Sequence, residues 1–85
     1  MPKSVFTDAY ASLVDEIIAL RRQKGVSQVE LAQRLGKTQQ FVSSIERRVR
    51  RLDVIELYAL VQAIGGDPEK LVLKVYRRLP RDVGI

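Results

Sequence analysis

The chain has 85 residues, of which 46% are hydrophobic and 29% are charged, and its net charge is +5 at pH 7. It contains no cysteine and no histidine, which excludes disulfides and thiolate metal sites and removes the commonest general base. No apolar run approaches the roughly 18 residues that span a bilayer, and the start MPKSVFTDAY lacks the hydrophobic segment of a signal peptide. We therefore expect a small cytoplasmic domain without membrane association, catalytic residue, metal or cofactor.

The first predicted helix begins near Thr7, which is the expected N-cap, and places Asp8 in its first turn. It runs to Lys24, and basic residues fill its last turn, where they favour the negative end of the helix dipole. Apolar residues at helical spacing define its expected buried stripe, namely Tyr10, Leu13, Ile17 and Leu20.

Two short amphipathic helices follow, over about 28–35 and 39–46, and a glycine turn at Gly36 joins them. Ser27 and Glu30 have the spacing of a capping box, in which each side chain bonds a backbone N–H of the other. Each helix carries its own inward stripe, formed by Leu31, Ala32 and Leu35 and then by Val42 and Ile45. This pattern predicts a helix-turn-helix, whose second helix can lie in the major groove of DNA.

The fourth predicted helix begins after Asp53, which forms a second capping arrangement with Glu56, and it ends at Gly65. Its expected inner face comprises Val54, Leu57, Leu60, Val61 and Ile64.

The fifth predicted helix has Asp67 as its N-cap and Pro68 at its first position, and it stops at Pro80. Its inward residues are expected to be Leu71, Val72, Val75 and Leu79. No segment alternates with period two, so no strand is expected. We therefore predict an all-α fold in a single domain over 1–85, with a core at 7–79 and a flexible tail at 80–85.

Positive charge is concentrated on the segment that carries the predicted helix-turn-helix. Residues 21–51 include nine basic and two acidic side chains, a net of +7, whereas the rest of the chain has six basic and eight acidic, a net of −2. The coincidence of charge and motif favours a nucleic-acid-binding surface over a merely solvated one.

Residues 17–72 resemble the DNA-binding domain of the phage repressor and Cro family, whose members are also called XRE-type regulators. The resemblance rests on the joint spacing of several pieces, since no single piece is diagnostic. These are Arg21, SQVELA at 27–32, LG at 35–36, TQQ at 38–40 and IER at 45–47. The resemblance implies a five-helix, lambda-repressor-like DNA-binding domain.

The resemblance also assigns roles to individual residues. Arg21 and Glu46 match a family ion pair that fixes the third helix against the first, and a guanidinium can grip a carboxylate at two points. Gln39 is the foremost base-reading residue, because a glutamine can bond N6 and N7 of adenine together. The predicted base contacts are Thr38, Gln39, Gln40 and Ser44. Phe41 is left open between contact with a thymine methyl and packing beside the fourth helix.

Contacts to the DNA backbone are expected from the turns on either side of the third helix and from the second helix. Gln28 matches a family glutamine that touches phosphate and in some members braces a recognition residue. The predicted set is Gln28, Lys37, Ser43, Arg47, Arg48, Arg50 and Arg51. Arg48 stands where the family usually has glycine. Because a left-handed backbone strains other residues by roughly 1 kcal/mol, the loop is expected to take another path.

The sequence thus predicts a sequence-specific regulator of transcription that binds double-stranded DNA, in a bacterium or phage, and most simply a repressor. A homodimer on a near-palindromic operator is expected, with Val75, Tyr76 and Leu79 as candidate interface, unless these residues close the monomer core. Two alternatives stay open. One is an antitoxin, or another module that neutralises a protein partner and uses DNA binding for autoregulation. The other is a controller of a restriction-modification system.

Overall fold

The computed structural model describes residues 7–85. Five α-helices and no strand occupy this part of the chain, which confirms the predicted all-α class. The domain predicted over 1–85 also includes residues 1–6, which lie outside the described residues. The helices are α1 (Asp8–Gln23), α2 (Gln28–Leu35), α3 (Gln39–Glu46), α4 (Val54–Ile64) and α5 (Pro68–Tyr76).

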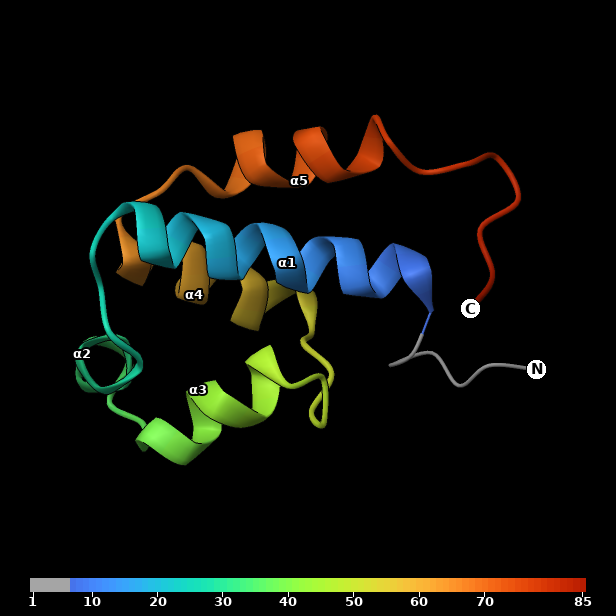
Figure 1. Cartoon of the computed structure of the whole chain (residues 1–85). Helices are drawn as coiled ribbons and strands as arrows, with labels where there is room; N and C mark the ends of the chain where they lie inside the picture. Colours follow the sequence, from blue (N-terminus) through green and yellow to red (C-terminus); the bar gives the residue numbers. More distant parts are fainter. Residues whose placement is uncertain (1–6) are drawn as a thin grey trace.

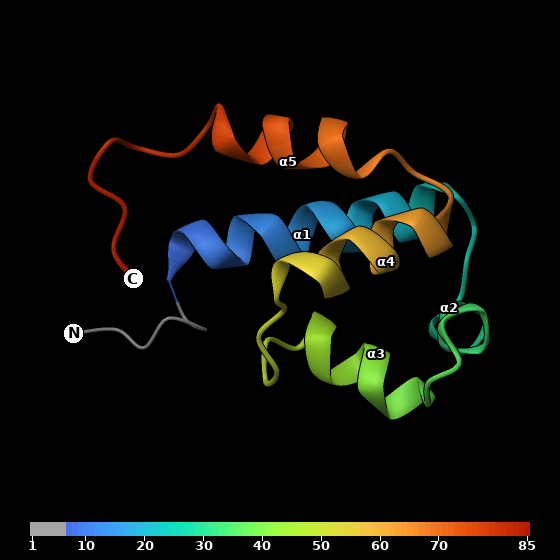
Figure 2. The same cartoon turned by 180° about the vertical axis from the view of Figure 1, so that it is seen from behind.

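The helices are arranged around α1, which crosses the middle of the molecule (Figure 1). Helix α5 lies along one side of α1 and α3 along the other, and the view from behind shows α4 beside α1 (Figure 2). Both views look down the axis of α2 while α3 lies across the view, so the two helices cross steeply. This is the geometry that leaves the outer face of α3 free to enter a groove.

A single hydrophobic cluster holds all five helices together. It includes Ile17 of α1, Leu31 of α2, Ile45 of α3, Leu60 of α4 and Val75 of α5, each 3% exposed or less. Because each helix contributes to the same cluster, the position of α3 depends on the packing of the whole domain.

Of the predicted buried stripes, only that of α3 is buried throughout, because Leu35 of α2 and Val72 and Leu79 of the α5 segment are only half-buried, and α1 and α4 depart further. In α1, Leu13 and Leu20 only pack at the rim of the core, whereas Val14 is 1% exposed. In α4, Val54 was expected to face inward but is 78% exposed. The first turn of α4 contributes no buried residue, so Val54 projects beyond the helices that cover the later turns.

Each helix begins at a polar N-cap whose side chain accepts a hydrogen bond from a backbone N–H, as predicted for Thr7, Ser27, Asp53 and Asp67. Asp53 and Glu56 form a complete capping box, with bonds of 2.7 and 3.0 Å. The box predicted for Ser27 and Glu30 is only half formed. Glu30 N–H donates to the Ser27 hydroxyl, but the Glu30 carboxylate accepts from Arg34 on the next turn instead.

Helix α5 ends earlier than predicted, at Tyr76 rather than just before Pro80. After Tyr76 the backbone tightens, and the N–H groups of Arg78 and Leu79 bond carbonyls three residues back. A proline disfavours the α conformation in the residue before it, which explains why the helix does not continue to Leu79. Beyond Pro80 the chain curls back toward the start of α1 (Figures 1 and 2).

Candidate nucleic-acid interface

The outer face of α3 carries the residues that were predicted to read bases. Val42 and Ile45 point into the core, each 1% exposed. This orientation leaves Gln40 exposed on the opposite side and Gln39 exposed on the flank beside α2. Thr38 is the N-cap, and its hydroxyl accepts from the backbone N–H of residue 41 at 3.2 Å. The four predicted base-contact residues are therefore at or near the first turns of one short helix, with Gln39 and Gln40 facing solvent.

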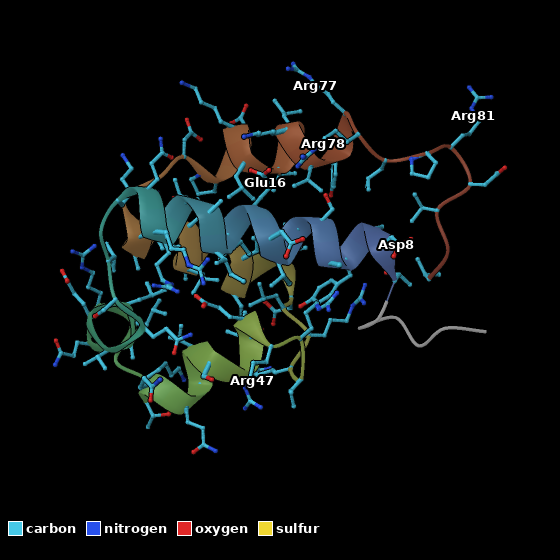
Figure 3. All side chains as sticks on the ribbon, in the orientation of Figure 1. Asp8, Glu16, Arg47, Arg77, Arg78 and Arg81 are labelled. Atoms are coloured by element: carbon cyan, nitrogen blue, oxygen red, sulfur yellow. The ribbon has the colours of Figure 1, made fainter. Side chains whose placement is uncertain are left out.

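The two serines of α3 differ from the glutamines, because both are half-buried. The Ser44 hydroxyl donates to the Phe41 carbonyl at 2.8 Å, so its proton is already used inside the helix. The Ser43 hydroxyl accepts from Arg47 Nε at 3.2 Å. Arg47 extends away from the body at the end of α3 (Figure 3).

A chain of hydrogen bonds connects the tip of α3 to the interior. Gln39 Nε2 donates to Gln28 Oε1 at 2.7 Å, and Gln28 Nε2 donates to Glu46 Oε1 at 2.9 Å. Gln28, which was predicted to contact phosphate, thus braces Gln39 in the DNA-free protein. Bracing is the second of the two roles that the family resemblance implied.

Arg21 and Glu46 meet in the bidentate arrangement described for the predicted ion pair. Arg21 Nε donates to Glu46 Oε2 at 2.6 Å, and Arg21 Nη2 donates to Glu46 Oε1 at 2.9 Å. The third arm of the guanidinium donates to the Val26 carbonyl at 2.8 Å. The side chains are only 11% and 7% exposed. Helix α1, the turn before α2 and the end of α3 are therefore joined at one point.

Cationic side chains surround Phe41, whose role the sequence left open. Phe41 is half-buried and packs against the core beside α4. The Lys37 ammonium lies 5.5 Å and the Arg50 guanidinium 5.1 Å from the centre of its ring. Arg50 also pairs with Glu56 of α4. Phe41 thus packs beside α4 and holds two of the predicted phosphate-binding side chains close to α3.

The loop after α3 keeps the left-handed path, which contradicts the expectation that Arg48 would avoid it. Arg48 has φ of 61° and is the one residue other than glycine with positive φ among those described. Its N–H bonds the Ile45 carbonyl at 3.0 Å, and the Val49 N–H bonds the Ser44 carbonyl at 2.9 Å. These are the two bonds of a Schellman motif, which satisfies the carbonyls at the helix end and offsets the strain at Arg48.

Comparison with known proteins agrees with this geometry. The family model described as "Helix-turn-helix" matches residues 17–71, well over half of the chain. The chain belongs to the XRE-type helix-turn-helix family. Membership places it among DNA-binding regulators of transcription.

Individual relatives of this XRE-type domain are similar over most of its length. It is 49% identical over 53 residues, 62% of this chain and 69% of the relative, to an uncharacterised HTH-type transcriptional regulator, y4dJ, of Sinorhizobium fredii. It matches an XRE-family like protein from Pseudomonas syringae pv. tomato with a TM-score of 0.82 and 43% identity, covering 85% of this chain and 88% of the other. The clp gene regulator ClgR from C. glutamicum shares the fold, with a TM-score of 0.70 at 20% identity, over 84% and 92% of the two chains.

Sequence reasoning about the XRE-type domain missed one connection to the loop. Tyr10 was expected only as an apolar residue of α1, yet its hydroxyl accepts from the Leu52 N–H at 3.0 Å and donates to the Arg50 carbonyl at 3.5 Å. The Arg51 guanidinium stacks over the same ring, 4.6 Å from its centre. The partners lie about forty residues away along the chain, and no local pattern reports a contact of that range.

The three residues predicted as a dimer interface are not equally available. Val75 is 3% exposed and belongs to the monomer core, so its predicted role at an interface is wrong. Leu79 is half-buried against the core, whereas Tyr76 is 64% exposed. Helical periodicity explains the difference, because Val75 and Tyr76 are neighbours in sequence and point about 100° apart.

No helix within residues 7–85 is long and apolar enough to cross a membrane. The same residues contain no cluster of acidic side chains that would hold a metal ion.

Proposed function

We propose that this XRE-type domain binds double-stranded DNA with sequence preference and represses transcription by occupying promoter DNA. The observation that carries the proposal is the exposed amide of Gln39, which Gln28 braces at the tip of α3. A braced amide with a free donor and acceptor suits adenine N6 and N7 in the major groove. Gln40 and the N-cap Thr38 lie beside it and extend the same polar surface.

We assign contacts with the DNA backbone to the charged residues on either side of α3. Lys37 lies just before the helix, and Arg47 follows its last residue. Both side chains are exposed and have no acidic ion-pair partner within the described residues. Such cations can neutralise phosphates and fix the register of α3 without reading sequence. Arg51 extends the positive surface along the following loop, and Arg50 lies beside it in an ion pair with Glu56.

A homodimer is part of the proposal, because two half-sites about one helical turn apart need two recognition helices. An apolar strip between α4 and α5, called here the α4–α5 seam, is the surface that we assign to the second copy. Two hollows meet along it and share Leu57 and Val72. Three residues of the seam are largely exposed: Val54 (78%), Tyr58 (56%) and Tyr76 (64%).

The position of the α4–α5 seam supports a second copy as its partner. Only residues 47–53 separate the end of α3 from the start of α4, so the seam begins close to the recognition helix. A twofold contact at Val54 and Tyr58 would therefore keep the two α3 helices on the same face of the dimer. The predicted interface residues all line one of its hollows, and Tyr76 is the one whose side chain is largely exposed there.

The decisive experiment is selection of binding sites from random duplexes, followed by titration of two variants. Gln39→Ala is expected to lower discrimination at one position of each half-site by about 1–3 kcal/mol. Lys37→Ala is the matched variant, because it removes an exposed neighbour of the same helix that is assigned to phosphate. It is expected to weaken binding to all sequences alike and to reduce the salt slope by about 1. Wild-type protein that selects no sequence at moderate salt would refute the proposal.

A further inference from the structure

The buried carboxylate of Glu46 imposes a direction on the hydrogen-bond chain that leads to Gln39. A carboxylate can only accept hydrogen bonds, and Arg21 can only donate them. Glu46 Oε1 accepts from Arg21 Nη2 and from Gln28 Nε2, both at 2.9 Å. The Gln28 amide must therefore turn its NH2 group inward, toward Glu46.

This constraint passes from Gln28 to Gln39. With its NH2 group turned inward, Gln28 presents Oε1 to α3, and Oε1 accepts from Gln39 Nε2 at 2.7 Å. Gln39 must in turn direct its own NH2 group at Gln28. Its carbonyl oxygen and its second N–H are left for a ligand, with the acceptor and the donor at defined positions.

The burial of the ion pair makes the constraint strong. The Glu46 side chain is 7% exposed and the Arg21 side chain 11%, so water does not compete for the carboxylate. A flipped Gln28 would point its carbonyl oxygen at Glu46, where no proton separates the two acceptors. A buried carboxylate that faces a carbonyl oxygen loses a hydrogen bond and is repelled by it. This costs far more free energy than breaking an exposed hydrogen bond.

We propose that Glu46, held by Arg21, is a positioning residue that sets the base preference of Gln39 through the orientation of Gln28. The inference rests on the proposed function, since it assumes that Gln39 meets a base. Adenine presents an N7 acceptor and an N6 donor in a fixed order. Only one orientation of the Gln39 amide can meet both at a given place, so loss of the buried carboxylate should relax the preference even if the fold is kept.

The test replaces the ion pair by apolar residues of similar volume in the double variant Arg21→Met/Glu46→Leu. Replacements of this kind are often neutral for stability. The matched control is Glu30→Gln. It removes the carboxylate that pairs with Arg34 within α2, and Glu30 has no hydrogen bond to Gln28 or Gln39. Binding is measured to duplexes that carry each of the four bases at the position where Gln39→Ala loses discrimination.

Wild type and the Glu30→Gln control are expected to prefer one base by about 5- to 150-fold. The double variant is expected to fall below about threefold with an unchanged salt slope. A double variant that folds, shown by circular dichroism, and keeps the wild-type ratio would overturn the proposal, because Glu46 would then have a structural role alone.

A second variant and a DNA-free measurement cover the remaining outcomes. Gln28→Met leaves the ion pair intact but breaks the hydrogen-bond relay from Glu46 through Gln28 to Gln39. It therefore tests whether the relay sets the base preference even if the double variant does not fold. Retention of the full preference in Gln28→Met would refute the proposal. In NMR spectra without DNA, one Gln39 Nε2 proton should show partial protection from exchange in wild type, less in the double variant, where Gln28 is free to flip, and none in Gln28→Met. If wild type shows no base preference, the proposed function fails. The exchange of the Gln39 amide proton then tests separately whether Glu46 and Gln28 orient Gln39.

Discussion

Arg48 shows how a single residue can be held in a conformation that its own chemistry disfavours. Its left-handed backbone lies at the C′ position of the Schellman motif that ends α3. A side chain at this position costs about 1 kcal/mol that glycine would not. Arg48 adds a positive charge beside α3, and the proposed function assigns this charge to a DNA phosphate.

Replacing Arg48 with glycine should therefore stabilise the free protein. We expect Arg48→Gly to raise the free energy of unfolding by about 1 kcal/mol, measured by urea denaturation. Arg48→Ala is the control, since alanine removes the charge and keeps the strain, and it should show no gain. Both variants should bind DNA more weakly than wild type and to a similar extent. A destabilised Arg48→Gly would show that the side chain, and not the backbone, dominates at this position.

At this scale, the residue types on the exposed face of α3 were predictable from spacing, whereas the partner of Gln39 came only from the family resemblance, as one of two roles for Gln28. Gln39 and Gln40 could be assigned to the exposed surface because Val42 and Ile45 fix the phase of α3. The direct bond from Gln39 to Gln28 crosses from α3 to α2 and depends on how steeply the two helices cross. Sequence spacing within one helix carries no information about that angle.

Among the elements, α1 and the α5 segment are joined by a small charge cluster around Glu16, which lies midway along α1. Glu16 Oε2 lies 3.2 Å from Lys74 Nζ, and Glu16 Oε1 lies 2.9 Å from Arg78 Nη2. Figure 3 shows Glu16 and Arg78 facing each other across the two helices. Burial raises the pKa of the Glu16 carboxyl, but hydrogen bonds from Lys74 and Arg78 outweigh it and hold the pKa below its ordinary value of 4.5.

The lowered pKa predicts a loss of stability in acid. A carboxyl whose pKa is lower in the folded state contributes its stabilisation above pH 4.5 and loses it as the pH falls through the folded pKa. Since both cations are more than half exposed, the contribution should stay under about 1 kcal/mol. Glu16→Gln should therefore unfold with a shallower pH dependence below pH 4.5, measured by thermal melts from pH 3 to 7. Identical slopes in wild type and variant would show that the cluster does not stabilise the helix pair.

Helix boundaries followed from the sequence where local chemistry fixes them. The starts of α2, α4 and α5 coincide with polar caps, and Gly36 and Gly65 end α2 and α4 with positive φ. The end of α5 and the inward faces of α1 and α4 were less predictable. They depend on which neighbouring helix covers each turn, and this is decided only when all five helices pack together.

At the scale of the whole molecule, the α4–α5 seam determines the expected assembly. An 85-residue domain buries a modest fraction of its surface, so association should add to its stability and make its melting temperature depend on concentration. A charge placed in the seam would face its own copy across a twofold axis. We expect Tyr58→Glu to weaken self-association by about 2 kcal/mol or more, measured by analytical ultracentrifugation without DNA.

The matched control for the seam is Val29→Glu, which places the same charge at an exposed apolar residue of α2. Its self-association should equal that of wild type. A wild-type protein that is monomeric at high concentration, or a Tyr58→Glu variant that dimerises normally, would contradict the assignment. In the second case, the partner surface must lie elsewhere on the domain.

The phenol of Tyr10 gives the molecule a property that matters when it meets a duplex. Because that hydroxyl fastens residues 50 and 52 to α1 in the unbound state, the segment after the recognition helix has already lost its conformational freedom. The entropy of ordering it belongs to folding and not to complex formation. Encounter with a target should therefore resemble the docking of a preformed surface, with rapid association and little further burial of backbone.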